Sequence, residues 1–165
     1  MDFVIRPYRA ADFERLWQID QVCFAEGIAY TQMELSGFIT RRNAIALVAE
    51  IPTAGKGSDS GSGDRPTKKD GVVGYAIAQP FRKTGRIITL DILPGARRHG
   101  LGSKLVMACE DRLRQRGCIE VYLEAAVNNE PALKLYHKIG YTILRTLPGY
   151  YHVHQLDAFL LGKAL

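Results

Sequence analysis

The stretch from Ile87 to Leu105 constrains the fold more than any other part of the sequence. It begins as a run rich in β-branched residues, passes through Pro94-Gly95 and a basic turn with two glycines at 97–102, and continues with the apolar spacing of a helix. In a strand, turn and helix of this order, the turn amides and the positive end of the helix dipole converge on one phosphate group. The stretch therefore predicts an anion site.

Two common phosphate-binding motifs do not fit this turn. A P-loop has Lys and then Ser or Thr directly after its second glycine, whereas Leu101 and Gly102 follow Gly100. A dinucleotide fingerprint has a third glycine three residues after the second, and that position is Leu105. Leu101 thus excludes a P-loop that binds ATP or GTP, and Leu105 excludes a dinucleotide-binding motif.

The bulk composition favours one domain spanning residues 1–165, because the chain is long enough for a sizeable core. The net charge of +5 is mild and dispersed, so no nucleic-acid partner is expected. No run is apolar enough to span a bilayer and the first residues lack a signal-peptide pattern, so we expect a cytoplasmic protein without a membrane partner. No metal is expected, because the cysteines lack metal spacing and the histidines do not complete a site: His99, His137, His152 and His154.

Hydrophobic periodicity predicts alternating strands and helices along the chain. Strands are expected at about 3–7, 44–51, 71–79, 86–90, 118–125, 141–145 and 154–161. Helices are expected at about 13–24, 32–41, 103–116 and 130–139. The order β-α-α-β-β-β-α-β-α-β-β is typical of a mixed α/β or α+β domain with one central sheet.

Local signals place several of the boundaries. Asp12 and Asn129 are expected to cap the first and last helices, and Thr31 to Glu34 has the pattern of a capping box. Turns are expected at Pro80 to Gly85 and around Pro148 to Tyr151. These residue types favour helix starts and chain reversals over the interiors of helices and strands.

Two further segments have clear patterns. Residues 52–70 contain almost no apolar side chain, so we expect a long mobile loop there. The strand at 118–125 alternates in polarity, with Ile119, Val121 and Leu123 predicted on one face and the more polar side chains on the other, namely Glu120, Tyr122 and Glu124.

The turn motif resembles that of a known family. Arg97-x-x-Gly-x-Gly, preceded by Leu90-x-Ile92-x-Pro94, is similar to the acetyl-coenzyme A signature of the GCN5-related N-acetyltransferase (GNAT) superfamily. Leu123 to Tyr141 resembles the second conserved block of that family, with an Asn before a helix that carries a Tyr. Within the superfamily, the chain is most similar to the RimI-type ribosomal-protein N-terminal acetyltransferases. The resemblance implies a mostly antiparallel, twisted sheet of six or seven strands flanked by about four helices.

The resemblance also implies catalytic roles. Glu124 would act as general base, directly or through a water, and Tyr136 as the acid that donates to the departing sulfur. Asp91 is the rival base, because it lies on the strand that would bind the cofactor. Each residue also has an ordinary structural interpretation: a solvated strand carboxylate for Glu124, and a core aromatic for Tyr136.

The implied acetyl donor is acetyl-CoA. Backbone groups of Leu90 and Ile92 would pair with its pantetheine arm like an added strand, and turn amides would hold its pyrophosphate. The residues expected to bind it are Leu90, Asp91, Ile92, Arg97, Arg98, His99, Gly100, Leu101, Gly102, Ser103 and Asn129.

The implied acceptor is a primary amine. A protein or peptide N-terminal amine is the main hypothesis, since an α-amine with a pKa of about 8 loses its proton more easily than a lysine at about 10.4. A small amine such as a polyamine, an amino acid or an antibiotic is the alternative, as is an acyl-CoA-binding module without turnover. A monomer or homodimer is expected. Four aromatics are either the walls of an acceptor groove or ordinary half-buried residues: Phe24, Tyr30, Tyr150 and Tyr151.

Overall fold

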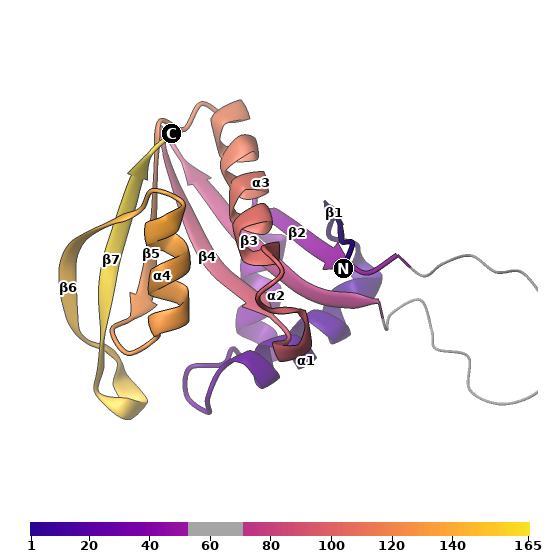
Figure 1. The fold of residues 1–165 in the computed structure, drawn as a ribbon, viewed down its shortest axis with the longest axis horizontal. Helices are drawn as coiled ribbons and strands as arrows, with labels where there is room; N and C mark the ends of the chain where they lie inside the picture. Colours follow the sequence, from indigo (N-terminus) through magenta and orange to yellow (C-terminus); the bar gives the residue numbers. More distant parts are fainter. Residues whose placement is uncertain (53–70) are drawn as a thin grey trace, which may run out of the picture.

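The computed structural model describes residues 1–52 and 71–165, and these form one seven-stranded sheet with helices on both faces (Figure 1). The strands are β1 (Val4–Pro7), β2 (Ile45–Glu50), β3 (Val72–Phe81), β4 (Thr84–Ile92), β5 (Glu120–Ala126), β6 (Thr142–Tyr151) and β7 (Leu156–Ala164). The helices are α1 (Phe13–Cys23), α2 (Gln32–Thr40), α3 (Leu101–Gln115) and α4 (Glu130–Lys138). None of these helices is both long and apolar enough to cross a membrane.

The predicted element order is confirmed, and the sheet order is β1-β2-β3-β4-β5-β7-β6. Neighbouring strands are antiparallel except β4 and β5, which are parallel. Alternate side chains of the strands enter two separate cores. The core beside α1 and α2 includes Leu16, Leu35 and Tyr75, and the core beside α3 and α4 includes Leu105 and Tyr136.

The strands β4 and β5 stay paired over a short distance only. Their register runs from Thr84 opposite Glu120 to Arg86 opposite Tyr122, and beyond it the two strands diverge (Figure 1). The rest of β5 remains paired with β7 on its other side. The second half of β4 is therefore left with an open edge that faces the second half of β5.

Several predicted helix boundaries are confirmed. Thr31 Oγ1 accepts from the Glu34 amide at 3.2 Å, and the Glu34 carboxylate accepts from the Thr31 amide at 2.8 Å, as in a capping box. Asn129 Oδ1 caps α4 through the Ala132 amide at 3.3 Å. The chain turns after α3 at Gly117 with φ +84°, a conformation that glycine adopts at little cost.

The predicted cap at Asp12 is wrong. Its carboxylate accepts two hydrogen bonds from the Arg6 guanidinium at 2.8 and 2.9 Å and one from the Arg9 amide at 2.8 Å. It makes none to an amide of α1. The charged guanidinium is a stronger partner than a neutral amide, and it ties β1 to the start of the helix.

The predicted turn at Pro80 to Gly85 is shorter in the structure, because both strands extend into it. Pro80 pairs opposite Gly85, and only Arg82 and Lys83 remain for the turn. Two-residue turns match the twist of an antiparallel pair, and Arg82 supplies a positive φ of +55°. Ile119, predicted on the buried face of β5, lies before that strand and is 60% exposed.

The turn predicted around Pro148 to Tyr151 also lies inside a strand. These residues belong to β6, and the chain reverses later, at 152–155. The pairing of β6 with β7 shifts register between Leu147 and Tyr151. A proline lacks an amide donor, and Gly149 has φ +60° with its amide bonded to the Asp157 carboxylate at 2.8 Å. A bulge thus accommodates both turn-forming residues. The loop expected at 52–70 lies outside the described residues apart from Pro52.

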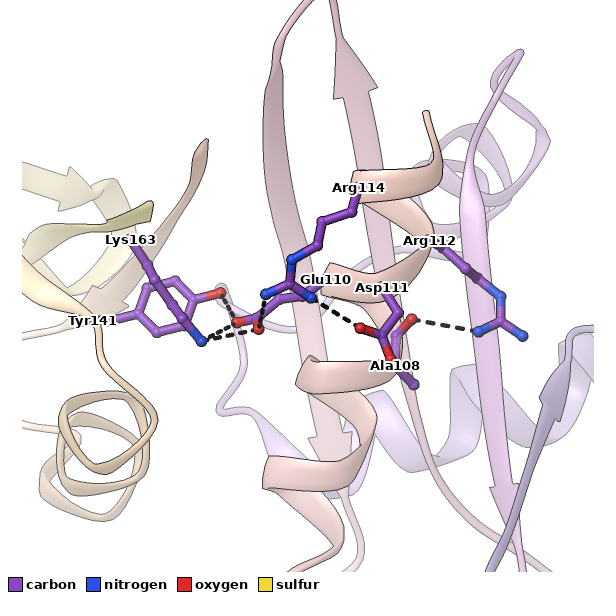
Figure 2. A network of polar contacts seen from close by, with 7 residues as sticks. All are labelled: Ala108, Glu110, Asp111, Arg112, Arg114, Tyr141 and Lys163. Atoms are coloured by element: carbon purple, nitrogen blue, oxygen red, sulfur yellow. Dashed lines mark hydrogen bonds and ion pairs between the residues drawn. The ribbon is translucent and has the colours of Figure 1, made fainter. Parts of the chain in front are cut away.

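A buried polar network fastens α3 to the C-terminal strands (Figure 2). The Glu110 side chain is 2% exposed and accepts from the Tyr141 hydroxyl at 2.9 Å and from Lys163 Nζ at 2.9 and 3.1 Å. Arg114 adds a longer ion pair at 3.8 Å. Because the Tyr141 ring also packs edge-on against Tyr136 at 5.7 Å between centroids, the network supports that side chain as well.

We expect Glu110→Ala to lower the free energy of unfolding by about 3 to 5 kcal/mol, because it leaves the Lys163 ammonium and the Tyr141 hydroxyl without their buried partner. Urea unfolding measures this loss. Asp111→Ala is the matched control: its carboxylate is 68% exposed, and we expect a change within about 0.5 kcal/mol. Equal losses in the two variants would contradict the role of the network.

Candidate active site

A cleft of about 1050 Å³ opens where β4 and β5 diverge. One wall is the open edge of β4 at 87–90, and the opposite wall is β5 at 123–126 together with α4. The remaining walls are two loops, which we call the acceptor loop (24–31, between α1 and α2) and the β6–β7 turn (152–155). The cleft is therefore built from segments far apart in the sequence.

Glu124 and Arg86 form an ion pair on one wall of this cleft. The Arg86 Nε and Nη2 atoms both donate to Glu124 Oε2, at 3.1 and 3.0 Å, and Nη2 also lies 3.2 Å from the Tyr150 hydroxyl. Burial works against the charge of Arg86, but the adjacent Glu124 carboxylate outweighs it and raises the arginine pKa. Glu124 Oε1 makes no hydrogen bond to another described residue, so this oxygen is free to accept a proton from a bound amine or water.

Tyr136 lies on the side of the cleft formed by α4. Its side chain is nearly buried, and its hydroxyl makes no hydrogen bond to another described residue. Burial raises the pKa of Tyr136 well above its usual value, and the nearby charge of Asp91 adds to the effect. The phenol therefore keeps its proton at neutral pH and can donate a hydrogen bond into the cleft.

The turn before α3 has the geometry of an anion site. Arg98 and Gly100 have positive φ angles of +65° and +76°, so successive amides of the turn point in a shared direction. The amides of residues 98–103 donate no hydrogen bond within the described chain. The Lys104 amide is the first of the helix to be bonded, to the Gly100 carbonyl at 3.2 Å.

Gly102 has a packing role in addition to its place in the turn. A Cβ at this position would lie 2.9 Å from a methyl group of Leu135 and 3.3 Å from one of Ile92. Glycine therefore allows α4 to pack closely against the start of α3. This contact joins the turn at 97–102 to the helix that carries Tyr136.

Three side chains predicted to bind the acetyl donor, those of Arg97, His99 and Asn129, make contacts outside the turn. Arg97 Nε donates to the Ile92 carbonyl at 2.8 Å, and its Nη2 lies 3.7 Å from Cys23 Sγ, so this arginine is held against β4 and α1. The His99 ring lies 6.4 Å from that of Phe3. Asn129 lines the cleft and also caps α4, so both of its predicted roles are geometrically compatible.

Asp91, the rival base, does not line the cleft. Its carboxyl group is fully buried on the α1 side of the sheet and accepts from Thr89 Oγ1 at 2.6 Å. Of the two candidate bases, only Glu124 faces the space that an acceptor can enter. The geometry favours Glu124.

All four candidate acceptor aromatics line the cleft: Phe24, Tyr30, Tyr150 and Tyr151. Phe24 and Tyr30 belong to the acceptor loop, and Tyr150 and Tyr151 are the last residues of β6. The acceptor loop touches the β6–β7 turn, since His154 Nε2 lies 2.9 Å from the Glu26 carbonyl oxygen. Sequence reasoning missed Arg86, which joins Glu124 to this aromatic end. Its only sequence signal is its place in the strand before the turn, and its partner is 38 residues away.

The comparison with known families decides the assignment. The sequence model of the Acetyltransferase (GNAT) family matches residues 59–141, about half of the chain. The chain belongs to the GNAT family. The predicted resemblance is thereby confirmed, and the match includes both the turn at 97–102 and the block with Glu124 and Tyr136.

Several GNAT relatives are named for N-terminal acetylation. An N-alpha-acetyltransferase of Sulfurisphaera tokodaii is 34% identical over 84 residues, which are 50% of this chain and 50% of the relative. The chain thus spans about half the length of the curated relatives it matches.

Solved GNAT structures share the whole fold. The NatC complex bound to Gag peptide and CoA contains a chain that superposes with a TM-score of 0.80 at 23% identity, covering 100% of this chain and 99% of that one. The ribosomal-protein-S18-alanine N-acetyltransferase of Escherichia coli superposes with a TM-score of 0.77 at 18% identity, covering 99% and 94%. At these identities, the agreement establishes a common fold.

Proposed function

We propose that this protein is an acetyl-CoA-dependent N-acetyltransferase that acts on the N-terminal α-amine of a protein or peptide by direct attack on the thioester. The observation that carries the proposal is that Glu124 and Tyr136 line the same cleft. Glu124 Oε1 and the Tyr136 hydroxyl make no hydrogen bond to another described residue. The amides of residues 98–103, which donate no hydrogen bond within the described chain, favour an anionic acetyl donor. The aromatic side chains that line the other end of the cleft favour a peptide there.

The donor half of the cleft fits coenzyme A. Amides of residues 98–103 would hold the pyrophosphate at the N-terminus of α3. The open edge of β4 offers backbone groups to the pantetheine arm, which would pair with Leu90 and Ile92 as an added strand. The Arg97 guanidinium already occupies the Ile92 carbonyl, so the amides of the turn carry most of the anion binding.

The two polar side chains divide the chemistry of acetyl transfer. Glu124 Oε1 accepts a proton from the ammonium form of the acceptor, directly or through a water, and the freed amine attacks the thioester carbon. A backbone amide of β4 stabilises the negative charge that develops on the thioester oxygen. As the carbon–sulfur bond breaks, the Tyr136 hydroxyl hydrogen-bonds to the leaving sulfur and gives it a proton, and the proton lost by the attacking nitrogen returns to the tyrosine through water. An amide and the free thiol are the products, and Glu124 releases its proton to solvent.

An α-amine is the acceptor that this site serves best. Glu124 is held in place by Arg86, and an amine with a pKa of about 8 is deprotonated at far less cost than one at about 10.4. The names of the curated relatives and the RimI-type motif support the same acceptor class. Aromatic walls from the acceptor loop and the end of β6 suit the first residues of a peptide chain.

Release of free thiol from acetyl-CoA tests this function, with a panel of peptides that have free N-termini. Each peptide is paired with an N-terminally blocked copy that keeps an internal lysine, and a polyamine is included. We expect thiol release with free N-termini only. Release with the polyamine alone would favour a small-amine acetyltransferase, and tight acetyl-CoA binding without release for any acceptor would favour a non-catalytic binding module.

A further inference from the structure

Two acidic side chains meet beneath the cleft, where the mechanism does not use them. Asp20 of α1 and Asp91 of β4 are both 0% exposed, and their carboxyl groups lie close enough to share a hydrogen bond. Tyr75 of β3 lies directly opposite Asp91 in the sheet and is equally buried. Buried acids are rare unless they are paired, and here the partner of each acid is the other.

The oxygens of this pair can be satisfied in one protonation state only. Asp20 Oδ2 accepts from the Tyr30 amide at 2.6 Å, and Asp91 Oδ1 accepts from Thr89 Oγ1 at 2.6 Å. With both groups ionised, Asp20 Oδ1, Asp91 Oδ2 and the Tyr75 hydroxyl have no partner. A single proton shared between the two facing carboxyl oxygens gives each of them a partner. The geometry therefore fits a carboxylic acid hydrogen-bonded to a carboxylate.

The pair connects the two halves of the cleft. Thr89, bonded to Asp91, lines the donor wall on β4, and Tyr30, bonded to Asp20, lines the acceptor end. The Tyr30 carbonyl is held from the same helix, by Trp17 Nε1 at 3.2 Å and Gln21 Nε2 at 2.8 Å. The backbone on both sides of the Tyr30 ring is thus fixed through α1.

We propose that the Asp20–Asp91 pair is a positioning device, which holds Tyr30 and the acceptor loop against β4 only while the pair keeps its shared proton. Loss of that proton places two negative charges in contact inside the core. The acceptor loop then separates from β4, and acceptor binding weakens. This inference rests on the proposed function for its acceptor, although its structural part does not.

The titration of the pair supports this dependence on protonation. Burial, together with the charge of Asp20, raises the pKa of Asp91 to about 8, and burial also raises the pKa of Asp20. Most groups around the pair are neutral at pH 7 or acidic: Tyr75 from β3, Cys23 from α1, Tyr30 from the acceptor loop, Tyr136 from α4 and Glu34 from α2. The Arg97 guanidinium lies beside Cys23 and donates to the Ile92 carbonyl, and it makes no ion pair with either acid.

These pKa values determine how the stability of the folded chain depends on pH. An unfolded Asp titrates at about 3.9, so between about pH 4 and pH 8 the folded chain binds more protons than the unfolded chain. The stability associated with this proton is complete below about pH 4 and is lost as the pH rises through about 8. The acceptor loop loosens at the upper end of that range.

The single tryptophan of the chain provides a direct test without any substrate. Trp17 donates to the Tyr30 carbonyl, so its fluorescence should change with an apparent pKa of about 8 as the loop separates. The titration stays below about pH 9.5, where ordinary tyrosines remain neutral. Asp91→Asn, and independently Asp20→Asn, should abolish the transition because an amide and a carboxylate need no shared proton. Asp111→Asn, an exposed acid on α3, should keep it.

Steady-state kinetics test the functional part. In the unchanged protein, KM for the acceptor peptide should rise by up to about tenfold per pH unit above pH 8, because the binding-competent fraction falls with the proton concentration. KM for acetyl-CoA should change little, and Asp91→Asn should remove the rise. Absence of the fluorescence transition, or its survival in both amide variants, would overturn the proposal, as would an equal rise of the two KM values. Failure of every acceptor to react, with the fluorescence result intact, would contradict the proposed function and leave the positioning pair standing.

Discussion

Tyr136→Phe is expected to lower kcat by about 100-fold while KM for acetyl-CoA changes less than about twofold. The ring remains packed against Tyr141, so the cleft keeps its shape. What is lost is the hydroxyl that has no partner in the described chain and that we propose as the donor to the departing sulfur. Because this hydrogen bond forms only as the thiolate develops, its removal affects the transition state and spares substrate binding. Steady-state kinetics with a saturating acceptor measure the effect.

Tyr122→Phe is the matched control for this change. Tyr122 lies on β5 outside the cleft, and its hydroxyl is near Glu120. We expect its removal to leave kcat within about twofold of normal. Near-normal turnover in Tyr136→Phe, or an equal loss in both variants, would contradict the assignment of Tyr136.

Glu124→Gln is expected to lower kcat/KM for the acceptor by about 100- to 1000-fold near neutral pH. The amide keeps the size of the side chain but cannot take up the proton of the ammonium group. Arg86 also loses its ion pair and becomes a free cation beside the acceptor amine, which further disfavours the ammonium form that binds. Rates at several pH values, with the same peptide, measure both contributions.

Two acid-to-amide variants serve as controls for Glu124. Glu120 precedes it by four residues on the same face of β5 but lies outside the cleft, where it accepts from Thr84 Oγ1 at 3.3 Å. Glu120→Gln should therefore retain nearly full activity. Asp91→Asn should retain kcat at pH 7, since the carboxyl of Asp91 does not reach the cleft. A larger fall in kcat for Asp91→Asn than for Glu124→Gln would make Asp91 the base.

The features that could be predicted from the sequence depend on short-range physics. The capping box at Thr31 and the cap at Asn129 each involve residues three apart, so their patterns are visible in the chain itself. The strand, turn and helix at 87–105 are equally local. The same reasoning failed at Asp12 because a guanidinium six residues away is a better partner than a helix amide.

The features that could not be predicted depend on strand register and helix packing. The Arg86–Glu124 ion pair joins residues 38 positions apart and exists only because β4 and β5 are parallel neighbours at that point. The Asp20–Asp91 contact needs α1 to lie across β4, and Asp20 on its own interrupts an otherwise apolar helix face. Turn-forming residues at Pro148 were misplaced because a bulge inside a strand uses the same residue types as a turn.

The central claim is that the cleft transfers an acetyl group from acetyl-CoA to an N-terminal α-amine. Fragmentation mass spectrometry of a peptide with a free N-terminus and an internal lysine, after incubation with the protein and acetyl-CoA, tests it most directly. We predict that the peptide gains one acetyl group, on its first residue. The Glu124→Gln and Tyr136→Phe variants should give no such product at matched times. An acetyl group on the lysine, or equal product with these two variants, would contradict it.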